Sequence, residues 1–171
     1  LIPCAGGGSR AGTAQPKQYE PIAGLPMVAH TLAAFGAVAR LSGCLVVVAP
    51  GDGTLNVDDR RTVVVPCGGP TRADSVLNGL EHLLAQDVHP DDWVLVHDAA
   101  RCLVTPAQID ALIDACEGDA VGGLLALPLA DTLKSAAGER VAQTVDRSGK
   151  WLAQTPQMFR VGALADALRR T

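Results

Sequence analysis

Two kinds of apolar pattern alternate along the chain. Continuous runs rich in valine and leucine predict strands at 45–49, 62–65, 93–97 and 121–127, and the run at 45–49 is typical of a buried parallel strand. Between them, apolar residues recur every three or four positions and predict helices at 26–37, 71–84 and 105–116. This alternation predicts an α/β domain with a mostly parallel sheet, flanked by helices and connected by right-handed crossovers.

Two of the predicted helices carry clear start signals. Thr71 is followed three residues later by Asp74, which is the spacing of a capping pair. Thr105 is followed directly by Pro106, and proline is favoured at the first position of a helix. These signals place the helix starts more firmly than the apolar periodicity alone.

The stretch 131–157 departs from the alternation. It reads as extended segments joined by turns at 137–138 and 148–149, and its few apolar residues are too sparse to fill a core. We therefore expect a β-arm that projects from the domain and pairs with a second subunit. An ordinary hairpin at the edge of the sheet is the alternative.

Length, charge and cysteine content narrow the class of protein. A chain of 171 residues predicts one domain over 1–171, and no apolar run approaches the roughly 18 residues that span a membrane. The net charge of −4 argues against a general nucleic-acid binder. Five scattered cysteines without a C-x-x-C spacing suggest reduced thiols, and no signal peptide is visible, so a cytoplasmic location is expected.

The strongest candidate for chemistry is the glycine-rich loop 5–9, which follows the apolar residues Leu1 and Ile2. Glycines let the backbone approach an anion, and the following cations Arg10 and Lys17 can neutralise phosphate charge. The loop fits neither the Walker pattern nor the dinucleotide fingerprint. We interpret it as a loop that binds a nucleoside triphosphate, with an ordinary glycine turn as the alternative.

Two further loops are expected at the carboxyl ends of strands, where open α/β sheets bind ligands. In the loop 67–75, Gly68 and Gly69 would admit a flat base and Ser75 could hydrogen-bond it. In the loop 97–101, Asp98 is a suitable ligand for Mg²⁺, although a turn or capping aspartate is the alternative. His97 is expected to support its loop by hydrogen bonding.

Together with motifs further along the chain, these loops resemble the 2-C-methyl-D-erythritol 4-phosphate cytidylyltransferases of the non-mevalonate isoprenoid pathway. The resemblance covers nearly the whole chain and rests on seven motifs in the same order: 3–10, 16–19, 68–76, 96–101, 128–134, 144–147 and 154–159. It implies a Rossmann-like fold of the nucleotide-diphospho-sugar transferase type and a homodimer that exchanges the β-arm.

The resemblance also implies an activity. Members of this family join CTP to 2-C-methyl-D-erythritol 4-phosphate, using Mg²⁺, and release pyrophosphate and 4-diphosphocytidyl-2-C-methyl-D-erythritol. The attacking phosphate oxygen is ionised at neutral pH, so alignment and charge neutralisation suffice and no general base is needed. Two alternatives stay open: a related enzyme that acts on ribitol 5-phosphate, and a catalytically impaired module for nucleotide binding or dimerisation.

Site residues follow by the same resemblance. Arg10 and Lys17 are expected to be catalytic and Asp98 to hold the metal. Nucleotide binding is expected from Pro3, Cys4, Ala5, Gly6, Gly7, Gly8, Gly68, Gly69, Pro70 and Ser75. Substrate binding is expected from Ala99, Arg101, Asp131, Thr132, Arg147 and Thr155.

Two departures from the family pattern are visible. Pro70 has no N–H to offer a base, although its carbonyl still accepts. Cys102 stands where the family commonly has proline, which we expect to affect only loop rigidity. The resemblance further implies a C-terminal segment with another lysine near the phosphates, and this segment is not among the 171 residues.

Overall fold

The computed structural model describes residues 1–7 and 15–171. One half of its sheet is a group of parallel strands. Strands β1 (Ile2–Pro3), β4 (Cys44–Val47) and β5 (Thr62–Val65) run parallel in the order β1-β4-β5. The side chains of β4 are largely buried, as expected of a continuous β-branched run. Strand β5 is an edge strand, and Val63 is 54% exposed on it.

A second group of strands continues the sheet. Strands β6 (Trp93–Val96), β10 (Trp151–Arg160) and β7 (Gly122–Pro128) lie in the order β6-β10-β7, with β10 antiparallel to both neighbours. Backbone hydrogen bonds of Leu1 connect the groups, because its nitrogen donates to the Leu95 carbonyl at 2.8 Å and its carbonyl accepts from the His97 N–H at 3.0 Å. The sheet is therefore mostly parallel, as predicted, with β10 as a reversed strand that the sequence pattern did not indicate.

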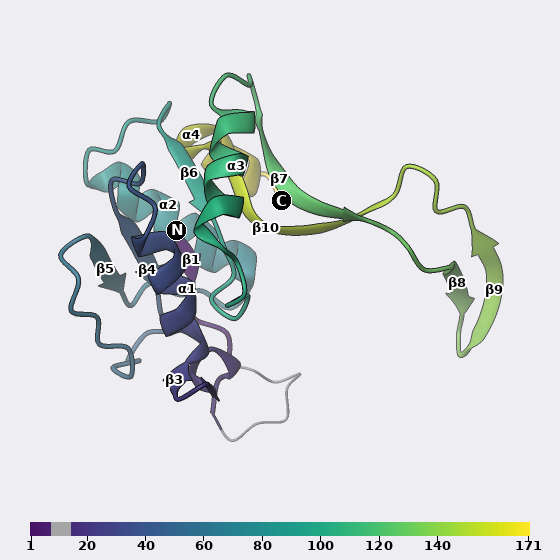
Figure 1. Ribbon diagram of the computed structural model, residues 1–171, viewed down its shortest axis with the longest axis horizontal. Helices are drawn as coiled ribbons and strands as arrows, with labels where there is room; N and C mark the ends of the chain where they lie inside the picture. Colours follow the sequence, from purple (N-terminus) through teal and green to yellow (C-terminus); the bar gives the residue numbers. More distant parts are fainter. Residues whose placement is uncertain (8–14) are drawn as a thin grey trace.

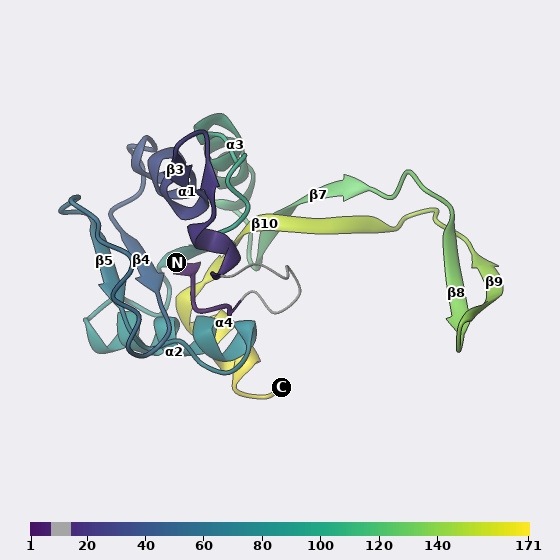
Figure 2. The ribbon, with the colours of Figure 1, turned by 90° about the horizontal axis from the view of Figure 1, so that it is seen from below.

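Two pairs of helices cover the two faces of the sheet. Figure 2 shows α1 (Met27–Gly36) and α3 (Pro106–Cys116) on one side, and α2 (Arg72–Ala85) and α4 (Val161–Leu168) on the other. Each face has its own buried apolar cluster, one beneath α1 and α3 and one beneath α2 and α4. Thr71 forms the predicted capping pair with Asp74, and Thr105, predicted as the residue before a helix-starting proline, forms a capping box with Gln108, so both helices begin where the sequence indicated.

The outer parts of β7 and β10 leave the sheet and form a long arm. The arm ends in a hairpin of β8 (Leu133–Ala137) and β9 (Arg140–Val145), which projects far from the helices (Figure 1). Strand β10 therefore belongs to the arm at its start and to the central sheet at its end. Strands β7 and β10 approach closely at Gly122, which requires glycine. Its φ is +118°, and an added Cβ would lie 2.0 Å from the Met158 carbonyl oxygen.

Small elements complete the region after the glycine loop. A 3₁₀ turn, η1 (Lys17–Tyr19), precedes a hairpin of β2 (Pro21–Ile22) and β3 (Leu25–Pro26). Among the helices described, none has both the length and the apolar character needed to cross a lipid bilayer. The loops that follow β1, β5 and β6 meet η1 at one edge of the sheet, and this edge carries the candidate site.

Candidate active site

A cavity of about 780 Å³ opens at the carboxyl edge of the parallel strands. Its walls come from the loops after β1, β5 and β6 and from η1, so segments distant in sequence converge there. Four lining residues were not assigned to the site from the sequence: Gln18, Thr71, Arg72 and Ala100. The other lining residues were all expected at the site: Pro3, Cys4, Ala5, Gly6, Gly7, Lys17, Gly69, Pro70, Ser75, Asp98 and Ala99.

At Gly68, the loop after β5 lies close to Ala5 on the loop after β1 and to Val48, which follows β4. A Cβ added at Gly68 would lie 2.3 Å from the Cβ of Ala5 and 2.8 Å from the Val48 carbonyl oxygen. The Gly68 N–H donates to that same carbonyl at 2.8 Å. Gly68 is therefore required for the close approach of the two loops that form the cavity wall, which gives it a packing role beside the predicted nucleotide contact.

Ser75 shapes the loop that precedes α2. Its hydroxyl is buried, accepts a hydrogen bond from the Gly69 N–H at 3.0 Å and lies 3.0 Å from the Thr71 carbonyl, to which it can donate. The capping box of Thr71 and Asp74 fixes the same turn from the other side. Because its hydrogen bonds go to the loop itself, the main structural contribution of Ser75 is to hold Gly69 at the cavity. One lone pair of its oxygen is left for a ligand.

Asp98 lies between two guanidinium groups at the mouth of the cavity. Its Oδ1 is 2.7 Å from Nε of Arg72, and its Oδ2 is 2.9 Å from Nε of Arg101. Burial alone would raise the pKa of Asp98, but the hydrogen bond and charge of Arg72, followed by those of Arg101, outweigh it and lower the pKa below its ordinary value. Asp98 is therefore a carboxylate at neutral pH.

His97 supports the same loop, as the sequence indicated. Its buried ring places Nε2 3.1 Å from the Arg101 carbonyl, and a carbonyl only accepts, so Nε2 carries the proton. Burial lowers the pKa of His97, so the ring is neutral and its Nδ1 accepts from the Thr155 hydroxyl at 3.0 Å. The Thr155 oxygen in turn accepts from the Asp98 N–H at 3.3 Å. Thr155 and His97 thus fix the backbone that presents Asp98.

A second cavity of about 560 Å³ lies next to the first. Lys17 and Ala100 line both cavities, so Lys17 lies where they meet. Arg101 and Thr155, expected on the substrate side, line the second cavity and not the first. The geometry therefore offers two adjacent compartments with a lysine between them.

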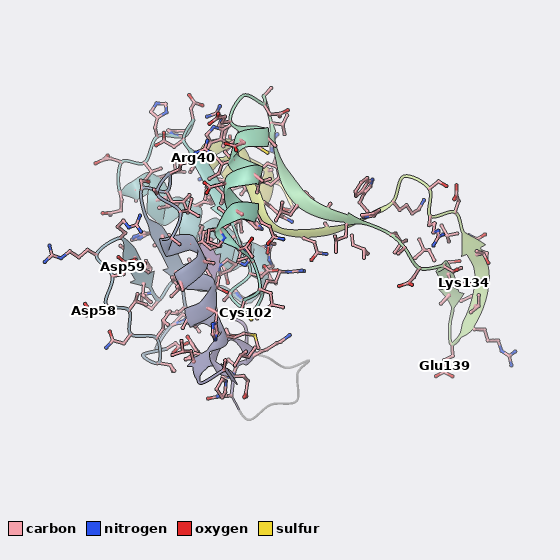
Figure 3. The ribbon with its side chains drawn as sticks, viewed as in Figure 1. Arg40, Asp58, Asp59, Cys102, Lys134 and Glu139 are labelled. Carbon is pink, nitrogen blue, oxygen red and sulfur yellow. The ribbon has the colours of Figure 1, made fainter. Side chains whose placement is uncertain are left out.

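Three expected substrate residues lie away from both cavities. Asp131, Thr132 and Arg147 flank the hairpin at the end of the arm, which Figure 3 marks by Lys134 and Glu139, far from Cys102 near the cavities. An arm in this position cannot bring them to the site of its own chain. Two other expected residues, Gly8 and Arg10, lie outside the described residues.

The described part of the chain holds no group of three or more His, Cys, Asp or Glu side chains placed to bind a metal ion. Asp98 is the one carboxylate among the described residues that line the first cavity. Mg²⁺ is commonly held by one or two carboxylates, with phosphate oxygens and water as the remaining ligands. The donor set fits a magnesium ion that arrives with a triphosphate.

Some residues that shape the site were not found from the sequence. Gln18 and Arg72 belong to short stretches that match the family pattern, but no periodicity or charge run assigns them a partner. Tyr19 donates a 2.6 Å hydrogen bond to Asp52, on the loop after β4, and thereby ties η1 to that loop. In each case the partner lies more than ten residues away in sequence, so only the folded chain reveals the contact.

Comparison with known proteins gives concordant results. The family model described as IspD, 2-C-methyl-D-erythritol 4-phosphate cytidylyltransferase, matches residues 1–171. The bifunctional enzyme IspD/IspF of Albidiferax ferrireducens is 64% identical over 99% of this chain, which spans 41% of that protein. The 2-C-methyl-D-erythritol 4-phosphate cytidylyltransferase of Laribacter hongkongensis is 57% identical, and the chain spans 75% of its length.

Solved structures show the same relationship. A crystal structure of 4-diphosphocytidyl-2C-methyl-D-erythritol synthase superposes with a TM-score of 0.86 at 38% identity, covering all of this chain and 77% of that one. The cytidylyltransferase from Francisella tularensis gives a TM-score of 0.83 at 33% identity, over 99% and 75% of the two chains. The chain belongs to the 2-C-methyl-D-erythritol 4-phosphate cytidylyltransferase family of nucleotidyltransferases.

Proposed function

We propose that this protein transfers a cytidylyl group from CTP to 2-C-methyl-D-erythritol 4-phosphate. The observation that carries the proposal is the pair of adjacent cavities with Lys17 between them. The first, walled by glycine loops, has the character of a triphosphate site, and the second has room for a polyol phosphate. Family membership supplies the identity of the two substrates.

The reaction is an in-line displacement at the α-phosphorus of CTP. A phosphate oxygen of the acceptor forms the new P–O bond, the bond to the bridging oxygen of the β-phosphate breaks, and pyrophosphate leaves with that electron pair. The acceptor phosphate is already ionised at neutral pH, so the protein must align the two substrates and neutralise charge. We expect the Lys17 ammonium, at the junction of the cavities, to stabilise the charge that builds up on the α-phosphate.

The glycine loop and the loop 67–75 have separate tasks in this proposal. Gly6 and Gly7 line the triphosphate cavity without side chains, so their backbone can approach the phosphates. Gly69 and Pro70, held by Ser75 and the capping box of α2, form the wall against which the base would lie. Arg10, which lies outside the described residues, remains a proposed second cation for the phosphates.

Magnesium is proposed as the cofactor, with Asp98 as its protein ligand. When bound, the ion would supply positive charge to the phosphate oxygens and template the triphosphate. Arg72 and Arg101 keep Asp98 ionised, and His97 and Thr155 fix its backbone. The low pKa keeps the carboxylate charged throughout the neutral range, as a metal ligand must be.

The acceptor side of the site is proposed to be completed by a second subunit. Asp131, Thr132 and Arg147 lie near the end of the projecting arm, where a partner's cavity could receive them. We also propose that the enzyme works in the cytoplasm, which agrees with its five free thiols. The expected assembly is a homodimer joined through the β-arm.

Pyrophosphate release tests this function directly. The protein is incubated with Mg²⁺, one of the four nucleoside triphosphates, and either 2-C-methyl-D-erythritol 4-phosphate or ribitol 5-phosphate. We expect release with CTP and the methylerythritol phosphate, and loss of at least about a hundredfold in kcat for Lys17→Ala. Faster release with ribitol 5-phosphate would reassign the acceptor, and CTP binding without release under any condition would indicate a binding module.

A further inference from the structure

A buried amide connects the 3₁₀ turn η1 to the glycine loop. Nε2 of Gln18 donates to the Cys4 carbonyl at 2.9 Å and to the Gly6 carbonyl at 3.0 Å. A side-chain amide nitrogen has two N–H groups, so both are used on carbonyls of this loop. Gln18 is only 6% exposed, although it lies on the wall of the triphosphate cavity.

These bonds control the direction in which the loop presents its dipoles. A carbonyl oxygen carries partial negative charge and would repel a phosphate if it faced the cavity. The Cys4 and Gly6 carbonyls are turned to Gln18, while the Cys4 N–H is committed to the Val47 carbonyl at 2.7 Å. The loop conformation before Gly8 is therefore fixed at Cys4 by the sheet and at Gly6 by Gln18.

The same residue fixes the cation that precedes it. Gln18 follows Lys17 directly in η1, and Tyr19 on its other side donates to Asp52 at 2.6 Å. Lys17 thus lies on a turn that is tied to the glycine loop by one hydrogen-bonding residue and to the loop after β4 by another. Without the bonds of Gln18, η1 and the glycine loop could move relative to each other, and Lys17 would move with η1.

We propose that Gln18 is a positioning residue for the triphosphate site, which holds the glycine loop and Lys17 in mutual register without itself reacting. The inference rests on the proposed cytidylyltransferase function and concerns the CTP half of the site. The second cavity, where the polyol phosphate is expected, is not lined by Gln18. Loss of Gln18 should therefore affect CTP more than the acceptor, whose cavity it reaches only through Lys17.

Two variants of similar size test the proposal. Gln18→Met keeps the length of the side chain and removes both donors, and Gln18→Glu keeps the shape but places a carboxylate against two carbonyls. We expect kcat/KM for CTP to fall about tenfold in Gln18→Met and further in Gln18→Glu, because small misplacements of aligned groups have large effects. The KM for the methylerythritol phosphate should stay within about twofold.

Val161→Ala provides a matched stability control. Val161 is buried at the start of α4, on the other face of the sheet, and touches neither cavity wall discussed above. A variant that is only less stable loses active molecules, which lowers the apparent kcat and leaves the KM for CTP unchanged. Melting temperatures of all variants, compared with that of Val161→Ala, separate the two effects.

Direct binding of CTP, measured by calorimetry, tests Gln18 independently of turnover. Weaker CTP binding in both Gln18 variants, with a folded protein, supports the positioning role. Unchanged CTP affinity and an unchanged KM for CTP in both variants would overturn it. If the unmodified protein binds CTP but releases no pyrophosphate with any acceptor, the proposed function fails, and the calorimetric comparison still decides the role of Gln18.

Discussion

At the scale of single residues, the absence of a side chain has a different structural reason at two glycines of the site. A Cβ at Gly68 would collide with Ala5 and Val48, whereas a Cβ at Gly6 meets nothing within 4 Å. We expect Gly68→Ala to lower the free energy of unfolding by about 1–3 kcal/mol through overpacking. Gly6→Ala should change it by less than about 0.5 kcal/mol and instead weaken CTP binding by occupying the cavity.

Urea denaturation and CTP calorimetry on the two glycine variants check this separation. The free energy of unfolding should change mainly in Gly68→Ala, and the affinity for CTP should change mainly in Gly6→Ala. Equal stability of Gly68→Ala and the unmodified protein would show that the two loops do not touch as described.

Cys4 predicts a dependence of stability on alkaline pH. Burial raises the pKa of the Cys4 thiol to about 11, from an ordinary value near 9.0. The folded state therefore holds this proton more tightly than the unfolded chain, and the resulting stabilisation is complete below pH 9 and lost as the pH rises through 11. Two pKa units correspond to about 2–3 kcal/mol.

The contribution of Cys4 is isolated by comparison with Cys4→Ala. Cys44, Cys67 and Cys116 also have raised pKa values, so the quantity of interest is the difference between the two proteins. From pH 9 to pH 11, the free energy of unfolding should fall more steeply for the unmodified protein than for Cys4→Ala. Parallel curves would mean that the Cys4 thiol is not buried as described.

The site residues that could be predicted share one property. Asp98 and the glycines stand at the ends of apolar runs, where the sequence itself marks the change from strand to loop, and Lys17 is a cation that follows the glycine loop. Gln18 and Arg72 could not be assigned a role in this way. Their partners are backbone carbonyls and a carboxylate on other loops, and such contacts exist only after the chain has folded.

At the scale of elements, the sequence indicated that 151–157 is extended but not that β10 lies within the central sheet. Strand β10 lies between β6 and β7, yet it contains Gln154, Thr155, Pro156 and Gln157, and a proline argues against a central strand. The structure accommodates it because the pairing of β10 with β7 shifts register between Ala153 and Gln157. Proline lies within this interruption, where no ladder bond with β7 is lost.

The helix that begins beside the triphosphate cavity allows a matched test of capping. At α2, the Thr71 hydroxyl accepts from the Asp74 N–H at 3.1 Å, and at α3 the Thr105 hydroxyl accepts from the Gln108 N–H at 3.3 Å. Removing either cap with alanine should lower the free energy of unfolding by about 1 kcal/mol. Only Thr71 lines the triphosphate cavity, so Thr71→Ala alone should weaken CTP binding.

Urea unfolding and CTP calorimetry on Thr71→Ala and Thr105→Ala check this expectation. The two variants serve as controls for each other, because the same bond is removed at two helices. If both bind CTP as tightly as the unmodified protein, the turn before α2 does not determine the shape of the nucleotide site.

At the scale of the whole molecule, the arm is the feature that a single chain does not explain. Its apolar side chains include Leu127, Val141 and Trp151, each more than half exposed. Exposed apolar residues gathered on one projecting element are typical of a surface that binds another protein. The expected substrate residues at its end also lack a site on their own chain, which is the reason for proposing a second subunit.

Complementation between two inactive variants tests whether the arm serves the partner's site. Lys17→Ala damages the cavity of its own chain, and Arg147→Ala damages the site that receives its arm. In a mixed dimer, one site then carries both defects and the other carries neither. The purified mixed dimer should therefore have about half of the unmodified activity, because one of its two sites is intact. Subunits are combined by co-expression, and the mixed dimer is purified by two different affinity tags before pyrophosphate release is measured.

If the arm served its own chain, each site of the mixed dimer would carry one defect, and its activity would equal only the average of the two variant homodimers.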